Sequence, residues 1–330
     1  MKKNIALIVF LISIVLTTGF LFGCGQQTTT ENPTTTSSST TTSSSTTTTV
    51  VAWRIIPSPT SEYLTSVYFV SPNNGWIAGD VGTILHWNGT TLETVSSPTT
   101  MDPSALALPS ANSGWIAGFE RMLRWDGASW SLYPTTFTYL QFYQFFFLSD
   151  NDGWVCANNG YPNGTILHWD GSSWSTVTSS IFGWTTSIYF NSPTDGWAAG
   201  MEGGYNIGKI SHYDGISWST VSIPTVEALQ SITFTSSNDG WAVGNDGTIL
   251  HYDGANWNSV SSPTANYLRS IIFTSPSDGW MVGDNTIFHY DGGSWSSMES
   301  ITSEVLTSIY AVSSTDVWAV GRNGIILRYH

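Results

Sequence analysis

An all-β fold is predicted by three features of this 330-residue sequence. A tryptophan that follows a small turn and opens a short apolar run recurs seven times, at spacings of 39, 39, 43, 44, 39 and 38 residues. Each repeat divides into four short apolar runs, which Gly, Asp and Pro separate. A period near 40 residues built from short strands indicates a seven-bladed β-propeller of four-stranded antiparallel blades. The seven tryptophans are Trp76, Trp115, Trp154, Trp197, Trp241, Trp280 and Trp318.

The clearest repeat, Leu268 to Met298, shows the expected strand order. Its four apolar runs are Leu268–Phe273, Trp280–Gly283, Thr286–Tyr290 and Trp295–Met298. Ile, Phe, Tyr, Trp and Val predominate in these runs, as they do in strands. The first run lacks strict alternation of apolar and polar residues, because both faces of a blade can be buried against its neighbours. We therefore expect four strands in every blade.

The two ends of the repeat region predict how the ring closes. A D-G-x-x-W hairpin introduces the fourth strand in five repeats and becomes N-G-T-T-L from Asn88 to Leu92 in the first. The last repeat stops at His330, before its fourth strand. Trp53–Ile56 followed by P-S-P-T matches Trp257–Val260 followed by S-S-P-T. We expect this N-terminal strand to complete the seventh blade and remove its free sheet edge.

Residues 1–23 have the organisation of an export signal. Lys2 and Lys3 precede an apolar stretch over residues 5–22, which is typical of a signal peptide. The L-F-G-C ending resembles the lipobox of bacterial lipoproteins, and this resemblance implies cleavage before Cys24 and lipidation of that residue. We expect an extracytoplasmic protein that is lipid-anchored to the outer membrane or cell surface. An uncleaved membrane helix is the alternative.

The remaining chain divides into a tether and one domain. Residues 24–49 are almost entirely Thr, Ser and Gln and cannot form a core, so the propeller is expected over residues 50–330. Nine Lys and Arg stand against 23 Asp and Glu, a net charge of −14, which disfavours nucleic acid and anionic lipid as partners. Cys156 aligns with Ala and Val of the other repeats, so we expect a buried free thiol.

Two sets of polar residues recur at fixed repeat positions, and we interpret both as scaffold. Ten of the 15 Asp residues lie in the loops that join strands one to two and three to four, at one end of the ring. Asp in such turns accepts hydrogen bonds from backbone N–H groups, so a cation-binding face is less favoured. Five His residues share one third-strand position and are spread around the ring, so neither a metal nor a cofactor is expected. We expect each His to be hydrogen-bonded, for example to a neighbouring blade. These residues are Asp126, Asp152, Asp170, Asp195, Asp214, Asp239, Asp253, Asp278, Asp291, Asp316, His86, His168, His212, His251 and His289.

The stretch G-W-A-V-G-N-D-G-T-I-L-H-Y-D-G-A-N-W, from Gly240 to Trp257, resembles the BNR or Asp-box-like repeat propellers, and in particular the photosystem II stability and assembly factor group. The likeness covers all seven repeats. The hairpin is shorter than the usual Asp box, S-x-D-x-G-x-x-W. The chain also has few arginines, which weakens the inference from the family that a partner docks on a basic patch. Members include assembly factors, sialidases and lipoproteins, so the resemblance implies the fold without selecting the function.

A sialidase-like glycoside hydrolase is one alternative. The segment Trp53–Pro57 resembles the F-R-I-P motif of sialidases, but it has an extra residue and belongs to an expected outer strand. Those enzymes gather an Arg triad, a Tyr with a Glu partner and an Asp acid at the ring axis, and the spacing yields no such set. A hydrolase would depend on Arg269 and Glu202, the blade-specific charged residues expected nearest the axis.

Repeats three and four carry features that the other repeats lack. Each has an insertion between its second and third strands, within residues 158–164 and 201–209, and Trp184 is the one tryptophan of 17 outside the repeat positions. Aromatic side chains flanked by amides suit a carbohydrate or a protein partner, and ordinary loop packing is an equal alternative. The candidate ligand-binding residues are Trp184, Phe182, Tyr161, Tyr205, Asn159, Asn163, Asn206, Glu202 and Arg269.

The sequence thus favours a monomeric, lipid-anchored propeller that acts as a non-catalytic binding or assembly scaffold for protein partners in the cell envelope. A carbohydrate-binding, lectin-like module is the second hypothesis, and the hydrolase is the third.

Overall fold

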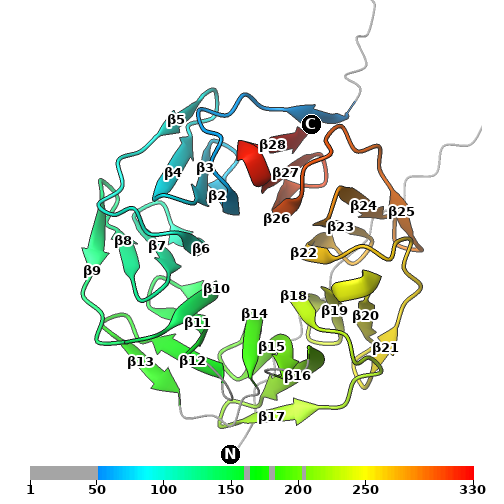
Figure 1. Cartoon of the computed structure of the whole chain (residues 1–330). Helices are drawn as coiled ribbons and strands as arrows, with labels where there is room; N and C mark the ends of the chain where they lie inside the picture. Colours follow the sequence, from blue (N-terminus) through cyan, green and yellow to red (C-terminus); the bar gives the residue numbers. More distant parts are fainter. Residues whose placement is uncertain (1–50, 160–163, 178–182, 203–205) are drawn as a thin grey trace, which may run out of the picture. The chain divides into compact units, whose positions relative to one another are not determined.

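The computed structural model describes residues 51–159, 164–177, 183–202 and 206–330. Seven four-stranded antiparallel sheets are arranged as a ring of blades around a central axis (Figure 1). The predicted fold class and blade number are therefore confirmed. Among the described residues, no helix has the length and apolar character needed to cross a membrane.

Six blades consist of consecutive strands, and the first strand of each is the innermost. Blade 1 contains β2 (Leu64–Ser71), β3 (Asn74–Gly79), β4 (Thr83–Trp87) and β5 (Leu92–Thr94). Blade 2 contains β6 (Pro103–Ser110), β7 (Ser113–Gly118), β8 (Met122–Trp125) and β9 (Trp130–Tyr133). Blade 3 contains β10 (Gln141–Ser149), β11 (Asp152–Asn158), β12 (Gly164–Trp169) and β13 (Trp174–Val177). Blade 4 contains β14 (Trp184–Ser192), β15 (Asp195–Glu202), β16 (Ile207–Tyr213) and β17 (Trp218–Val221). Blade 5 contains β18 (Leu229–Ser236), β19 (Asp239–Gly244), β20 (Ile249–Tyr252) and β21 (Trp257–Ser259). Blade 6 contains β22 (Leu268–Ser275), β23 (Asp278–Gly283), β24 (Thr286–Tyr290) and β25 (Trp295–Ser297).

Blade 7 joins the two ends of the propeller. Its inner strands are β26 (Leu306–Ser313), β27 (Asp316–Gly321) and β28 (Ile326–Tyr329), and its outer strand is β1 (Trp53–Ile55). β1 pairs antiparallel with β28, which confirms the predicted closure by the N-terminal strand. Two short 3₁₀ turns, η1 (Asn245–Gly247) and η2 (Arg322–Gly324), follow the second strands of blades 5 and 7.

Tryptophans form much of the packing between blades. The Trp of one blade's second strand meets the fourth-strand Trp of the next blade, edge to face, with ring centroids 5.3 Å apart for Trp115 and Trp174 and 5.8 Å apart for Trp241 and Trp295. Such aromatic pairs contribute about 0.5–1.5 kcal/mol beyond the burial of their surfaces. The repeated Trp positions in the sequence therefore encode the contact between one blade and the next.

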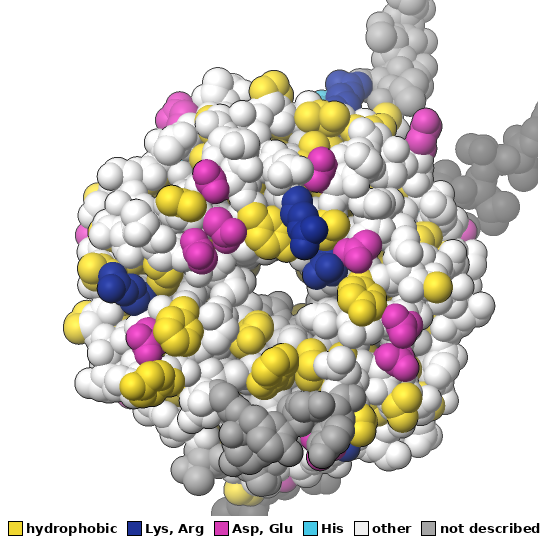
Figure 2. Space-filling model, in the orientation of Figure 1, with side chains coloured by type: hydrophobic (Ala, Val, Ile, Leu, Met, Phe, Trp, Pro, Cys, Tyr) yellow, Lys and Arg dark blue, Asp and Glu magenta, His cyan; other side chains and the backbone are white. Residues whose placement is uncertain are grey.

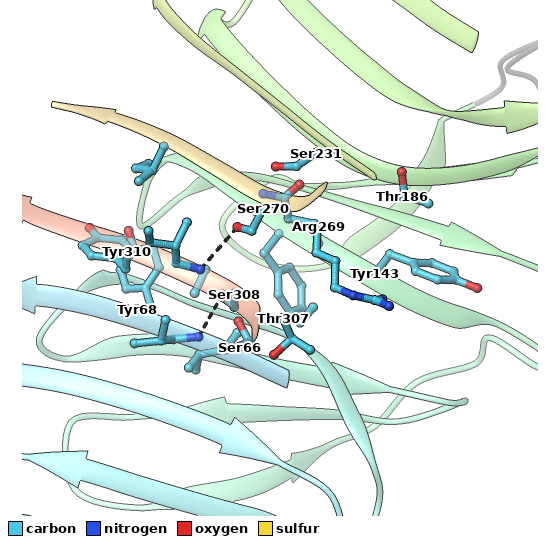
Figure 3. Close-up of a pocket in the computed structure, with 18 of the residues that line it drawn as sticks. Ser66, Tyr68, Tyr143, Thr186, Ser231, Arg269, Ser270, Thr307, Ser308 and Tyr310 are labelled. Carbon is cyan, nitrogen blue, oxygen red and sulfur yellow. Dashed lines mark hydrogen bonds between the residues drawn. The ribbon is translucent and has the colours of Figure 1, made fainter. Parts of the chain in front are cut away.

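Each inner strand contains a bulge, and at five of the seven blade junctions a polar contact between blades lies beside it. Strand pairing shifts near the start of all seven inner strands, after the first paired residue in blades 1, 2, 5, 6 and 7 and after the second in blades 3 and 4. The backbone N–H of Ile309 donates to Oγ of Ser270 in the preceding blade at 3.3 Å (Figure 3). In blade 3 the acceptor is Oε1 of Gln144, which lies 3.0 Å from the backbone nitrogen of Ile188. A side-chain oxygen thus accepts a hydrogen bond from an N–H group next to the bulge.

The recurring His residues are structural, but the expected partner in a neighbouring blade was wrong. Nε2 of His212 lies 2.8 Å from Oδ1 of Asp195 in its own blade, and its ring lies against Trp197 with centroids 4.3 Å apart. The second and third strands pair so that these three residues meet within one sheet. In blade 7 the equivalent pair is Arg328 and Asp316, with Nε and Oδ1 2.8 Å apart.

The Asp residues of the loops between strands one and two therefore do not act as the turn acceptors that were expected. Their carboxylates bind a third-strand side chain, at 2.8 Å for Asp152 with His168 and 2.6 Å for Asp278 with His289. The prediction failed because turn chemistry is local, whereas this contact depends on the register between two strands. Their assignment to the scaffold is unaffected.

The Asp residues of the outer hairpins do act as the predicted turn acceptors. Oδ1 of Asp170 accepts the Oγ–H of Ser172 at 2.7 Å and the backbone N–H groups of Ser172 and Ser173, each at 2.8 Å. These hydrogen bonds lower the pKa of Asp170 to about 2. Oδ1 of Asn88 accepts the corresponding N–H groups in blade 1, so the uncharged amide reproduces the turn.

Cys156 is a buried free thiol, as predicted. Burial raises the pKa of this thiol to about 12, so it is protonated at neutral pH.

Replacing Trp53 by Ala should destabilise the ring at its closure. Trp53 is buried, and its ring meets Trp280 edge to face at 5.6 Å, so the substitution leaves a cavity between blades 6 and 7. We expect the free energy of unfolding, measured by urea denaturation, to fall by about 3–5 kcal/mol. Ile55→Ala, at an exposed position of the same strand, is the control and should change it by about 0.5 kcal/mol or less. Equal losses for both variants would contradict the role of Trp53.

Asp170→Asn should reduce the acid sensitivity of the propeller. The folded pKa of Asp170 is depressed, so its stabilisation is present above the unfolded pKa and is lost as the pH falls from about 4 to about 2. The amide does not titrate, so the melting temperature of the variant should fall less over this range. Asn88→Asp should make the fall steeper. A pH profile identical in all three proteins would refute this origin of acid lability.

Candidate docking face

One end of the ring is formed by the loops that join second to third strands and fourth strands to the next first strand, and we name it the mouth face. Figure 2 shows this face, with the central opening at its middle. The recurrent Asp–His pairs and the hairpin Asp residues belong to the loops at the other end. The loops of the mouth face therefore take no part in these repeated contacts, and their sequences can differ from blade to blade.

Exposed apolar side chains gather on the mouth face. Eleven large apolar residues are exposed in the described part of the chain. Seven of them lie in the loops of the mouth face or at the end of an inner strand that meets this face. Figure 2 shows hydrophobic side chains, in yellow, around the opening of this face. Single exposed apolar residues are ordinary, but a concentration at one end of a molecule indicates an interaction surface. The seven residues are Val81, Phe119, Tyr139, Trp184, Val226, Tyr267 and Ile301.

A cavity of about 340 Å³ lies on the ring axis and is lined by the inner strands of all seven blades. Polar side chains such as Ser66 and Thr307 alternate there with aromatic ones (Figure 3). The rings of Tyr68 and Tyr310 lie 4.9 Å apart, and burial raises the pKa of both phenols, so both are protonated at neutral pH. The channel can therefore accept small polar groups as well as water.

Arg269 lies at the axis, as predicted, but Glu202 does not join it. Nε of Arg269 lies 2.8 Å from Oδ1 of Asp284, and its side chain extends into the cavity beside Tyr143 (Figure 3). Glu202 ends β15, and its Oε2 lies 3.2 Å from Nζ of Lys209 on the paired strand. Glu202 is not among the residues that line the central cavity. The structure thus assigns each of the two charges to a separate ion pair.

The other predicted ligand residues are only partly described. Trp184 is the first residue of β14, opposite Met201, and is 42% exposed at the mouth face. Asn159 and Asn206 are also exposed there. Four further candidates and the predicted lipidation site lie outside the described residues: Tyr161, Asn163, Phe182, Tyr205 and Cys24.

A buried polar contact joins blades 3 and 4 beneath this surface, and the sequence analysis did not predict it. The backbone N–H of Thr185 donates to Oδ1 of Asn158 at 3.1 Å, and both side chains are buried. Thr185 occupies the inner-strand position that is a fully buried Leu in blades 1, 5, 6 and 7. A polar residue at a position that is otherwise Leu was the available sequence signal.

Negative charge predominates on the mouth face around blades 1 and 2. Partial burial, Asp102 and Glu62 together raise the pKa of Asp80. Two cations of this face, Arg269 and Lys209, are already engaged in ion pairs. Arg322 of η2 lies over the ring of Tyr63, with 5.8 Å between its guanidinium carbon and the ring centroid. The face therefore suits a partner that brings apolar groups together with positive charge.

No set of three or more His, Cys, Asp or Glu side chains is placed to hold a metal ion within the described ranges.

Six of the seven exposed apolar residues on the mouth face were missed by sequence reasoning, which singled out Trp184 alone. They fall in six different loops, and consecutive members lie between 20 and 87 residues apart along the chain, so no local motif joins them. The available signal was their residue type, since apolar residues replace the Asn, Asp or Gly usual in turns.

No protein-family model matches this chain, and no curated protein matches it. Solved structures do resemble it. YCF48 bound to a D1 peptide is 21% identical, with a TM-score of 0.68 over 84% of this chain and 94% of that one. YCF48 from Cyanidioschyzon merolae is 18% identical, with a TM-score of 0.68 over 84% and 98% of the two chains. The WD40 β-propeller domain of Doa1 is 11% identical, with a TM-score of 0.70 over 85% and 97%. At these identities the comparisons establish the β-propeller fold that the chain shares with these proteins.

Proposed function

We propose that this chain is a non-catalytic, lipid-anchored scaffold of the cell envelope that binds a segment of a protein partner on its mouth face. The observation that carries the proposal is the concentration of seven exposed apolar side chains on that one face. Apolar contacts of this kind supply affinity, and the surrounding charges supply specificity. YCF48, which has the same fold, has been solved with a D1 peptide bound, and this precedent supports peptide binding by a propeller.

A binding role is favoured over hydrolysis by the two charged residues on which a hydrolase would depend. Arg269 is paired with Asp284, and Glu202 is paired with Lys209 on another part of the face. A sialidase-like hydrolase would need its Arg and Glu side chains gathered at the ring axis, as part of an Arg triad and a Tyr–Glu pair. The pairing of each charge with its own partner favours structural roles for both residues.

The proposed anchor rests on the sequence at Cys24. Lipidation of Cys24 would attach the propeller to a membrane through the Thr- and Ser-rich residues 24–49. A flexible tether of this composition allows the domain to reorient toward a partner. An extracytoplasmic location follows from the same proposal.

Cys24→Ser should abolish lipidation when the full chain is produced in bacteria. Metabolic labelling with an alkyne-tagged fatty acid should mark the wild-type chain, and the variant should lose the label and leave the membrane fraction. Cys156→Ala is the matched control, because Cys156 is the one other cysteine of the sequence and is buried. It should keep the label. Label retained by Cys24→Ser would exclude the proposed anchor.

Photo-crosslinking should locate the partner on the mouth face. A photoreactive phenylalanine analogue placed at Tyr139 or Tyr267 should capture a protein partner in intact cells, because both side chains are exposed there. The control position is Ile216, which is 89% exposed in a hairpin at the opposite end of the ring. The same adducts at Ile216 would refute docking on the mouth face.

A carbohydrate ligand would give a different pattern in parallel experiments. No protein adduct would form at Tyr139 or Tyr267, and cell-wall polysaccharide would bind saturably to the chain. This binding would be lost in Trp184→Ala, since Trp184 is the exposed aromatic residue of blade 4 at the mouth face. That combination of results would replace the scaffold with the lectin-like function.

A further inference from the structure

We propose that the groove between blades 1 and 2 on the mouth face is the anchor subsite of the partner segment, where a Lys or Arg side chain enters between Asp80 and Asp102 and an adjacent apolar side chain packs on Phe119. This inference rests on the proposed function and names the chemistry of the partner. Nucleic acid and anionic lipid are poor occupants of such a site, because their phosphates would face carboxylates.

The groove is a built feature of the fold. It has a volume of about 580 Å³ and is lined by the second-to-third-strand loops of blades 1 and 2 and by the segment that leads from one blade to the next. Asp80, Asp102 and Phe119 line it together with Met101. It shares the lining residues Thr65 and Ser104 with the central cavity, so the two adjoin at the mouth. An extended peptide can therefore lie in the groove and continue toward the axis.

Neither Asp80 nor Asp102 forms an ion pair within the described part of the chain. Burial, Asp102 and Glu62 all act on Asp80 in the same direction and raise its pKa. Arg121 also lines the groove, but its Nη1 donates to Oγ1 of Thr99 at 3.5 Å, and it does not offset the repulsion that Asp80 experiences. A cation from a partner would relieve this repulsion and bind at the same time.

Backbone geometry points to the same sector. Seven non-glycine residues of the described chain have positive φ, and four of them, in blades 4 to 7, are Asn or Asp, which tolerate this conformation. The other three are Val81 (φ 58°), Glu120 (φ 59°) and Tyr139 (φ 62°), and all lie on the mouth face at blades 1 and 2 or at the start of blade 3. The turn of Val81 and Glu120 is the one that Asn or Asp occupies in blades 4 to 7, so the unusual feature is the residue type, and strained residues cluster at functional surfaces.

Val81 is the sharpest case, because a β-branched side chain is poorly suited to a left-handed turn. Its side chain is 58% exposed, so burial does not explain its presence. The turn is held from blade 2, where Oδ1 of Asp102 accepts the backbone N–H of Val81 at 2.8 Å. The equivalent residues in blades 5 and 7 are Asp246 and Asn323. An exposed Val at the rim of an acidic groove is explained by contact with an apolar group of the partner.

The test uses the full chain, immobilised and panned against phage-displayed random 12-residue peptides. Enriched peptides should carry Lys or Arg beside an apolar residue. Asp80→Asn should weaken their affinity about tenfold, as expected for loss of one charge-assisted contact. In the best peptide, Lys→Gln should cost as much with the wild-type chain and little with Asp80→Asn, which is the signature of a direct pair.

Two further variants separate binding from folding. Val81→Asn should raise the melting temperature, because Asn tolerates the left-handed turn, while it weakens peptide binding severalfold. Asp246→Asn removes one charge at a mouth-face turn outside the groove and should leave the affinity unchanged.

The outcomes also separate this inference from the proposed function. Peptides that bind without a Lys or Arg preference, or equally well to Asp80→Asn, would overturn the anchor subsite. If the same peptides competed with crosslinking at Tyr139 and Tyr267, docking on the mouth face would still stand. Enrichment of no peptide would overturn both the subsite and the binding of a linear segment.

Discussion

Contact between the aromatic faces of adjacent blades is the interaction on which the rest of this structure depends. A single sheet of four short strands is stable only when its faces are covered, so each blade needs both neighbours. Tryptophan pairs such as Trp115 with Trp174 supply this contact from blade to blade. Every blade has both faces covered only when the ring is closed, and β1 closes the ring by completing blade 7.

This constraint divides the residues into those that must recur in the blades and those that can vary from blade to blade. Side chains that recur in the blades, such as the Asp195, Trp197 and His212 set, are engaged in contacts that hold one sheet together. The mouth-face loops take little part in those contacts and can differ between blades. Exposed apolar residues and strained turns occur there without interrupting the contacts between blades, which is why this face can acquire a binding role.

The mouth face combines three adjoining environments around the axis. Blades 1 and 2 present an acidic groove with Val81 and Phe119 at its rim, the axis presents Arg269 in its pair with Asp284, and blade 4 presents Trp184. A peptide spans several such environments at once, whereas one sugar ring needs only one aromatic platform. The position of the groove beside the central cavity therefore favours an extended protein segment as the ligand.

The repeated sequence by itself determined the number of blades, the order of their strands, the closure by the N-terminal strand and the burial of Cys156, because each depends on local patterns that recur at a fixed spacing. It also located Trp184 at the mouth-face end of its inner strand and Arg269 near the axis. Only the tertiary structure decided that the Asp residues of the first loops bind His side chains, because that contact depends on strand register. It likewise decided that Val81, Asp102 and Phe119 adjoin one groove. Residues from loops of different blades meet only once the ring has curved and closed, and no local pattern in the chain carries that geometry.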